Sequence, residues 1–241
     1  MEYARVYRDY SSKNEFKFNV TIHESDLFVI SDKDVKKHAL NALIKYRKII
    51  ENHIKQFPEF LKSLKPLKPP QDIDEKILLH MYSASNRAKV GPFASVAGAI
   101  AQFIGEELLN FCNEIIIENG GDIYINTKRD RVVKIFSKNL QNIGIKIKKE
   151  IQPLAVCSSS SKIGHSLSFG KGDLVIVIGK NAALADAYAT SICNKIKNEK
   201  DLQKIVNNVK EPLINGVITI LNDKIAFKRK DFEFIKINEG D

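Results

Sequence analysis

Asp186 and Thr190 are the pair of residues whose types and spacing most directly suggest chemistry. They are four residues apart in the run Asn181-Ala-Ala-Leu-Ala-Asp-Ala-Tyr-Ala-Thr-Ser, so on a helix they share a face, which the alanines keep open. A carboxylate and a hydroxyl at this spacing can supply two oxygens to Mg²⁺, which also takes backbone carbonyls, water and substrate phosphate. The same pair also occurs on ordinary helix surfaces, where it forms only a local hydrogen bond.

A second group of polar residues follows a β-rich run, in the sequence Cys157-Ser-Ser-Ser-Ser-Lys-Ile-Gly-His165. Its hydroxyl groups, with the ammonium of Lys162, suit phosphate oxygens. The serines that we take as candidates are Ser158, Ser159 and Ser160. By residue type His165 is a candidate general acid or base, although the sequence assigns it no carboxylate partner. A flexible serine-rich loop explains the same composition.

A third candidate is the start of the small-residue segment that follows Gly91 and Pro92 and includes Ala94 and Ser95. At a helix start the free backbone N–H groups and the positive end of the helix dipole can receive an anion. The alternative is a plain loop-to-helix junction, in which glycine serves only close packing.

A fourth candidate is the turn Asn119-Gly120-Gly121-Asp122. Its two glycines permit positive φ, and Asp122 places a carboxylate just past the turn. A simple hairpin turn explains all four residues without any function.

The elements that must position these residues are predicted to be a mixture of helices and strands. Two short strands are expected within residues 15–30, around a turn at 23–26. A helix follows, with Ser31 and Asp34 as a capping-box-like start and Pro58 as its end. The segment 64–70 contains three prolines and is expected to be a connector, and a candidate boundary between two lobes.

The second half of the chain is predicted to be rich in strands. A helix rich in Ala and Gly is expected at 94–112, so that something packs closely against it, followed by a hairpin with strands at 114–118 and 122–126. Further expected elements are strands at 132–136, 143–147, 154–157 and 174–178, a helix at 182–197, and a strand-rich tail at 213–237. Strands often follow strands directly, which favours an α+β fold with antiparallel sheet, as a single domain over 1–241.

Composition excludes several classes of protein. With 44% hydrophobic and 28% charged residues, the chain can build a core, and it is no fibre, mucin-like stalk or disulfide miniprotein. Cys112, Cys157 and Cys193 lack any C-x-x-C spacing, so neither a zinc site nor a disulfide framework is indicated. No secretion signal and no apolar run of membrane-spanning length is present, so we expect a cytoplasmic protein with no membrane contact.

The formal net charge of +9 raises the question of nucleic-acid binding. The basic residues are 31 lysines and only seven arginines, scattered along the chain. Phosphate or base recognition usually relies on clustered arginine, so this pattern argues against a nucleic-acid partner. A basic RNA-associated or scaffold protein is kept as the least favoured alternative.

Taken in order, the four motifs resemble the ApbE flavin transferase family, historically called thiamine biosynthesis lipoproteins, and more closely its cytoplasmic relatives. The resemblance covers about residues 85–195. Its elements are Gly91-x-x-Ala94, the hairpin Gly120-Gly121-Asp122, the serine-rich stretch Ala155–Ser160 leading to His165, and Ala185-Asp-Ala-x-Ala-Thr190. The last of these elements is the most specific.

The resemblance implies an ApbE-like fold, with largely antiparallel sheets packed by helices, that binds FAD together with Mg²⁺. It implies transfer of FMN to a Thr or Ser of an acceptor protein with release of AMP, the Mg²⁺ stabilising charge on the leaving AMP. Asp186, Thr190 and the carbonyl of Ala94 would be the Mg²⁺ ligands, and His165 or Asp122 would take the proton of the acceptor hydroxyl. The implied flavin-nucleotide contacts are Gly91, Ala94, Ser95, Gly120, Gly121, Ser158, Ser159, Ser160 and Lys162.

Two departures from the family pattern bear on activity. The family has Lys-Gly where this chain has Ser95-Val96, so a positive charge near the phosphates is missing, and Lys162 or Lys171 is a candidate replacement. The family's Ile-Asp-Pro-x-Thr-Gly after its His is replaced here by Ser-Leu-Ser-Phe-Gly-Lys-Gly. FAD pyrophosphatase activity and non-catalytic binding of a flavin or nucleotide therefore remain as alternatives. Homodimer formation also stays open, because the helix at 94–112 can pack against the chain's own sheet or a second subunit.

Overall fold

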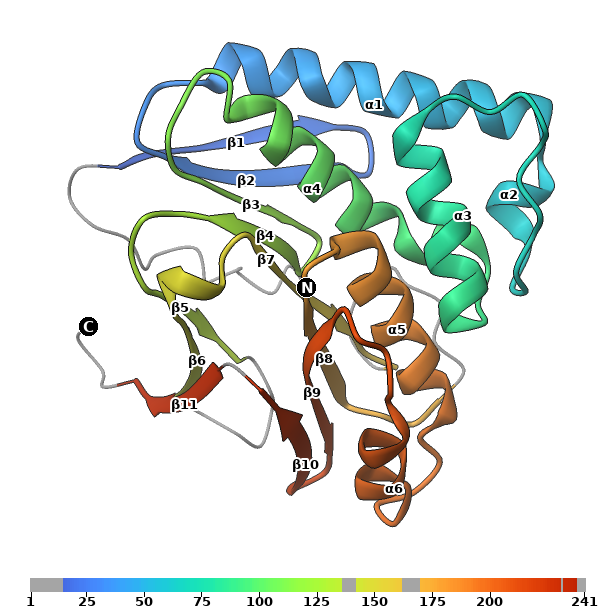
Figure 1. Ribbon diagram of the computed structural model, residues 1–241, viewed down its shortest axis with the longest axis vertical. Helices are drawn as coiled ribbons and strands as arrows, with labels where there is room; N and C mark the ends of the chain where they lie inside the picture. The colour runs from blue at the N-terminus through green and yellow to red at the C-terminus, as the bar shows by residue number, and fades with distance from the viewer. Residues whose placement is uncertain (1–14, 136–141, 162–169, 231, 238–241) are drawn as a thin grey trace.

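Two antiparallel β-sheets form the frame of the computed structural model, which describes residues 15–135, 142–161, 170–230 and 232–237 (Figure 1). Every neighbouring pair of strands is antiparallel. In order across the larger sheet, the strands are β1 (Phe16–Ile22), β2 (Ser25–Ser31), β3 (Ile115–Asn119), β4 (Asp122–Asn126), β7 (Leu154–Ser159), β8 (Leu174–Gly179), β9 (Ile214–Leu221) and β10 (Lys224–Arg229). The smaller sheet has the order β11 (Phe232–Lys236), β6 (Ile143–Ile147) and β5 (Arg131–Lys134).

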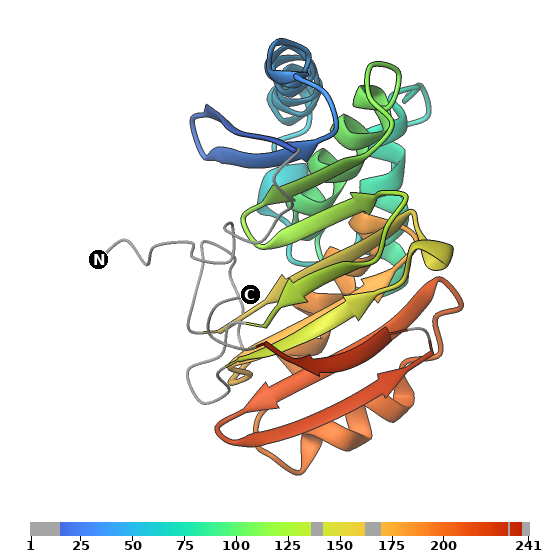
Figure 2. The ribbon, with the colours of Figure 1, turned by 90° about the vertical axis from the view of Figure 1, so that its left-hand side faces the viewer.

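The helices pack against one face of the larger sheet. Figure 2 shows the strands of both sheets in front, with α5 and α6 behind them. The helices are α1 (Lys36–Gln56), α2 (Glu59–Lys62), α3 (Lys76–Ala88), α4 (Val96–Leu108), α5 (Ala182–Lys195) and α6 (Asp201–Asn208), with short 3₁₀ helices η2 (Pro92–Ser95) and η3 (Lys149–Ile151). The α+β class with antiparallel sheets is therefore confirmed. In the part of the chain that the structure describes, no helix is both long and apolar enough to cross a membrane.

Strand β7 shows how the larger sheet separates two hydrophobic cores. Successive side chains of a strand point to opposite faces. Ala155 and Cys157 accordingly belong to the core beneath the helices, whereas Leu154 and Val156 belong to the core between the two sheets. The β7 backbone is thus enclosed on both sides, and only its ends are available to a ligand.

Most predicted elements are confirmed, with one wrong helix start. Ser31 is the last residue of β2 and pairs with Phe16 and Ile115, so it does not cap α1. Its hydroxyl donates instead to the carbonyl of Lys33 at 2.5 Å. The helix begins at Lys36, whose N–H donates to the Asp34 carboxylate at 3.1 Å. Because Ser31 is hydrogen-bonded in the larger sheet as part of β2, the helix α1 starts only at Lys36.

The segment 64–70 is irregular, as predicted. Helices on both sides of it contribute to the same core, for example Leu43 from α1 and Ile77 from α3. The helices α2, α3 and α6 were missed by the sequence interpretation. In α3 the signal was present, because its buried residues Ile77, Leu78, Met81 and Tyr82 recur at helical spacing.

The close packing expected around the Ala- and Gly-rich helix is found within the chain itself. A Cβ on Gly98 would lie 2.5 Å from the Ala182 carbonyl oxygen of α5, and one on Gly105 would lie 2.4 Å from the ring of Tyr124 in β4. The small residues of α4 are therefore covered by α5 and by the larger sheet.

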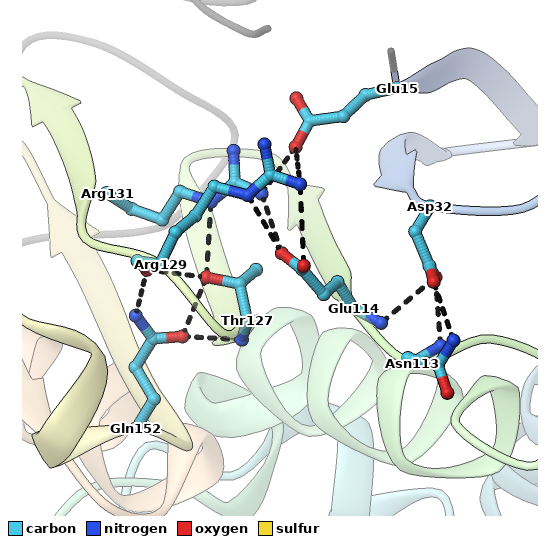
Figure 3. A network of polar contacts seen from close by, with 8 residues as sticks. All are labelled: Glu15, Asp32, Asn113, Glu114, Thr127, Arg129, Arg131 and Gln152. Carbon is cyan, nitrogen blue, oxygen red and sulfur yellow. Dashed lines mark hydrogen bonds and ion pairs between the residues drawn. The ribbon is translucent and has the colours of Figure 1, made fainter.

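A network of ion pairs connects the two sheets near the start of β1 (Figure 3). Arg131 of β5 pairs with Glu15, which precedes β1, and with Glu114, which precedes β3. The Arg129 side chain, at the end of the β4–β5 loop, donates to Glu114 at 3.1 Å. The side chains of Glu15 and Arg131 are only 2% and 10% exposed, so these pairs fasten the smaller sheet to the larger one from a largely buried position.

Candidate functional site

Two buried carboxyl groups, those of Asp122 and Asp186, meet between the larger sheet and the helices that cover it. Asp122 is the first residue of β4, Asp186 lies in α5, and they are 4% and 7% exposed. Burial, the charge of Asp186 and a hydrogen bond with it raise the pKa of Asp122 well above its usual range. Burial raises the pKa of Asp186 to about 7. Like charges in contact oppose joint ionisation, which favours a shared proton or a bound cation between the two carboxyl groups.

Asp186 also caps the start of α4. The N–H of Gly98 donates to Oδ2 of Asp186 at 3.0 Å, and the N–H of Ala97 forms a second hydrogen bond with this carboxylate. The first N–H groups of a helix have no partner within the helix and favour an anion. An anion site was predicted at the helix start that follows Gly91, and the carboxylate of Asp186 lies a little further along, at the start of α4 after η2.

The turn Asn119–Asp122 adopts the predicted hairpin geometry. Gly120 and Gly121 have φ of +64° and +102°, backbone angles that residues other than glycine rarely adopt. The N–H of Gly121 donates to Oε1 of Glu118 at 2.7 Å, and Nδ2 of Asn119 donates to the Ala97 carbonyl at 3.1 Å. The turn is therefore tied both to its own strand and to the start of α4.

The serine-rich segment is less of a loop than predicted. Ser158 and Ser159 belong to β7, because the ladder with β8 extends to the pair Ser159 and Val175. The N–H of Ser158 donates to Oδ1 of Asp122 at 2.9 Å, and its hydroxyl donates to the Gly121 carbonyl at 3.2 Å. Ser159 and Ser160 are both buried. This part of the serine run is thus a strand end that holds Asp122.

Ser159 has a buried hydroxyl oxygen with no hydrogen-bond partner among the described residues. It lies on the same face of β7 as Cys157, which contacts the Asp122 carboxyl. Burial raises the pKa of the Cys157 thiol, so this thiol is no ready nucleophile. Since buried polar groups are normally hydrogen-bonded, the unpaired Ser159 hydroxyl suits an oxygen or a cation of a ligand.

The donor set fits Mg²⁺. Thr190 is buried on α5 one turn after Asp186, as the spacing predicted, and Ala94 is half-buried in η2, close in sequence to the two N–H groups that hold Asp186. Within the described ranges, no group of three or more His, Cys, Asp or Glu side chains is arranged to hold a metal ion. Protein ligands would therefore be Asp186, hydroxyl oxygens and a carbonyl, the hard oxygen set that Mg²⁺ accepts beside water and phosphate.

Gly91 and Ser95, two of the predicted flavin-nucleotide contacts, occupy buried positions in the protein. A Cβ on Gly91 would lie 1.7 Å from the Ser63 carbonyl oxygen, so this glycine serves close packing against the connector. Ser95 is fully buried, and its hydroxyl donates to the Pro92 carbonyl at 2.7 Å. The hydroxyl of Ser95 is therefore already used within the protein. A lysine at position 95, as in the family pattern, would place an ammonium in this interior.

Two predicted site residues, Lys162 and His165, lie outside the residues that the structure describes. Lys171, the other candidate replacement for the missing charge, is exposed next to Gly170 and Gly172, and its N–H donates to the Ile196 carbonyl at 2.8 Å. The structure thus brings together Asp122, Asp186 and the turn that precedes Asp122. The sequence interpretation expected close packing against the Ala- and Gly-rich helix, but it did not identify Gly98 and α5 as the residues and the helix that meet.

Comparison with known proteins places the chain in a family. A family model described as "AbpE bacteria" matches residues 8–212. The chain is 37% identical over 235 residues to a UPF0280 protein of Methanocaldococcus jannaschii, covering 93% of this chain and 95% of that protein. It is also 37% identical over 206 residues to a UPF0280 protein of Methanobrevibacter smithii, covering 82% and 85%.

Solved structures show the same fold at low identity. The apo form of the flavinyl transferase ApbE of Pseudomonas stutzeri matches with a TM-score of 0.61 at 10% identity, over 89% of this chain and 94% of that one. The ApbE protein of Thermotoga maritima matches with a TM-score of 0.57 at 13% identity, over 89% and 96%. The chain therefore belongs to the family described as AbpE bacteria and has the fold of the ApbE proteins.

Proposed function

We propose that this protein binds FAD with Mg²⁺ and cleaves its pyrophosphate, transferring FMN to a Ser or Thr hydroxyl of an acceptor protein and releasing AMP. The observation that carries this proposal is the buried pair of Asp122 and Asp186, held at the start of α4. The fold supports it, since one matched structure is that of a flavinyl transferase. A carboxyl pair of this kind is costly to bury unless a cation or a proton neutralises it.

The proposed transfer has a simple balance of bonds. The acceptor's hydroxyl oxygen forms a bond to the phosphorus of the FMN half, and the bond from that phosphorus to the AMP oxygen breaks. The hydroxyl proton passes to a base of the protein. If water replaces the acceptor, the same cleavage yields FMN and AMP, which is FAD pyrophosphatase activity.

In this proposal, separate residues bind the metal ion, orient its ligand and accept the proton. Asp186, Thr190 and the Ala94 carbonyl would hold Mg²⁺, which supplies positive charge to the phosphate oxygens when bound. The N–H groups of Ala97 and Gly98 orient the carboxylate of Asp186. We assign the acceptor's proton first to His165, because the nearly enclosed carboxyl of Asp122 faces Asp186.

A second candidate function is binding of FAD or a related nucleotide without chemistry. The observation that favours it is Ser95, which brings no charge at the position where the family has lysine and whose hydroxyl is used by Pro92. Loss of a cation near the phosphates lowers stabilisation of the charge that develops on the leaving group. In this case the site would retain affinity for FAD and lack turnover.

The test is a reaction of purified protein with FAD and Mg²⁺, followed by chromatography with mass detection, with a chelator as control. Chelator-sensitive formation of AMP, with FMN free or added to protein mass, supports cleavage or transfer. Bound but intact FAD supports the second candidate. If FAD neither binds nor reacts in the presence of Mg²⁺, cleavage of FAD and binding of FAD are both refuted, and only binding of a related nucleotide is left to test. Asp186→Ala should abolish Mg²⁺-dependent binding while the fold persists.

A further inference from the structure

We infer that Asn119 is a positioning residue for Asp186, acting through the peptide group between Ala97 and Gly98. Nδ2 of Asn119 donates to the Ala97 carbonyl at 3.1 Å, and the Gly98 N–H donates to Oδ2 of Asp186 at 3.0 Å. This carbonyl and this N–H belong to one planar peptide unit. Asn119 therefore sets the direction of the N–H group that holds Asp186. The inference rests on the proposed function, in which Asp186 is a metal ligand.

The position of this peptide in α4 explains why it needs a second contact. It lies in the first turn, after the 3₁₀ helix η2, where the N–H groups have no acceptor within the helix. A hydrogen bond from Asn119 to the carbonyl restricts rotation of the peptide plane. It also polarises the peptide, which strengthens its N–H as a donor to Asp186.

The relay is buried and closely packed. Asn119 is 6% exposed. A Cβ on Gly98 would lie 2.5 Å from the Ala182 carbonyl oxygen and 2.9 Å from Cβ of Asp186, so only glycine lets the peptide come this near to α5. Loss of the Asn119 side chain would remove one hydrogen bond from the Ala97 carbonyl in these part-buried surroundings.

The hairpin turn Asn119–Asp122 interacts with Asp186 in two ways, one direct and one through a peptide group. Asn119 and Asp122 are paired residues at its two ends. Asp122 contacts Asp186 directly, carboxyl to carboxyl, whereas Asn119 acts through a neutral peptide. In metal sites, such outer hydrogen bonds orient the ligand, and their loss typically lowers metal affinity about 10–100-fold. We therefore assign to Asn119 the role of orienting the Asp186 carboxylate, a role that involves no change in the charge of the site.

The test compares Asn119→Ala with Asn110→Ala in the full-length protein. Asn110 is a matched control, because its Nδ2 also donates to a carbonyl of α4, that of Glu107 at 2.9 Å, but near the other end of the helix. The measurements are the amide proton chemical shift of Gly98 and the affinity for Mn²⁺, used as a paramagnetic substitute for Mg²⁺. We expect Asn119→Ala to move the Gly98 signal upfield and to weaken Mn²⁺ binding about 10-fold, and Asn110→Ala to change neither.

Each other outcome is decisive. An unchanged Gly98 signal in Asn119→Ala overturns the relay, and a shifted signal with unchanged Mn²⁺ affinity overturns the positioning role. If the Ala variant does not fold, Asn119→Ser, with its shorter side chain, takes its place. If the wild-type protein binds no Mn²⁺, the metal part of the proposed function fails. Asn119 is then judged by the ¹³C signal of the Asp186 carboxyl, which must move in the variant if the relay exists.

Discussion

Asp122 and Asp186 are brought together from a strand and a helix so that their carboxyl groups are hydrogen-bonded to each other inside the protein. Each also accepts a backbone hydrogen bond, Asp122 from Ser158 and Asp186 from Gly98. Two carboxyl groups in contact form a site whose charge depends on pH and on cations. The predictions below start from this pair.

The stability of the metal-free protein should fall as pH rises from about 4 to about 7. In the folded protein the pKa of Asp186 is raised to about 7 from an ordinary value of 3.8. The folded state therefore holds a proton that the unfolded state has already released, and unfolding becomes easier as that proton is lost. Thermal unfolding in chelator across this range measures the slope.

Mg²⁺ should counteract this loss, and its stabilising effect should be larger at pH 8 than at pH 6, because it competes with the shared proton. Asp122→Asn removes one of the two charges and should flatten the slope in chelator. Parallel pH curves for this variant and the wild type would contradict the coupling between the two carboxyl groups.

Thr190→Val should weaken Mg²⁺ binding about tenfold, an order-of-magnitude loss like that of an outer hydrogen bond at a metal site. Valine keeps the shape of threonine and removes the hydroxyl. The control is Ser191→Ala, a buried residue that follows Thr190 on α5 and points away from it by the helical angle. Titration calorimetry measures both affinities, and equal values in the two variants would remove Thr190 from the site.

Gly98→Ala should destabilise the fold by about 1–3 kcal/mol, the usual cost of overpacking a core. The added Cβ would meet the Ala182 carbonyl oxygen of α5 at 2.5 Å, and backbone cannot move aside cheaply. Gly120→Asn is the control, since no atom lies within 4 Å of a Cβ there and asparagine tolerates its φ of +64°. Urea unfolding gives both values, and a neutral Gly98→Ala variant would show that α4 and α5 can separate.

Glu114→Gln should cost about 1–3 kcal/mol, less than a fully buried pair because Arg129 is partly exposed. Among the residues that the structure describes, the change removes one of the two carboxylates, Glu114 and Glu15, that pair with Arg129 and Arg131 (Figure 3). The matched control is Glu233→Gln, whose ion pair with Lys148 is about half exposed on both sides and should contribute less than about 1 kcal/mol. The measurement is the free energy of unfolding of each variant. Similar losses of stability in Glu114→Gln and Glu233→Gln would refute a larger contribution from the buried ion pairs.

Local sequence patterns predicted those parts of the site that depend on neighbours along the chain. The hairpin turn follows from the positive φ that Gly120 and Gly121 permit. The shared face of Asp186 and Thr190 follows from helical spacing, and Asn181 caps that helix where it was expected to begin. These properties require only a few consecutive residues.

Competition between elements explains the errors. Ser31 has the residue type of a cap, but its pairing with β1 and β3 keeps it in the sheet. Ser158 and Ser159 have the composition of a loop, but the β8 strand continues their ladder. In each case a partner distant in sequence decided the local structure, which propensity alone does not describe.

The sequence by itself determined the fold class, the hairpin, and the helix that carries Asp186 and Thr190, because periodicity and turn chemistry act over short distances. Only the tertiary structure decided that Asp186 caps α4, that it contacts Asp122, and that Asn119 reaches the same carboxylate through a peptide group. These contacts join β3, β4, α4 and α5, and they depend on how closely the two helices approach. Packing of the whole core sets that distance, and no short stretch of sequence records it.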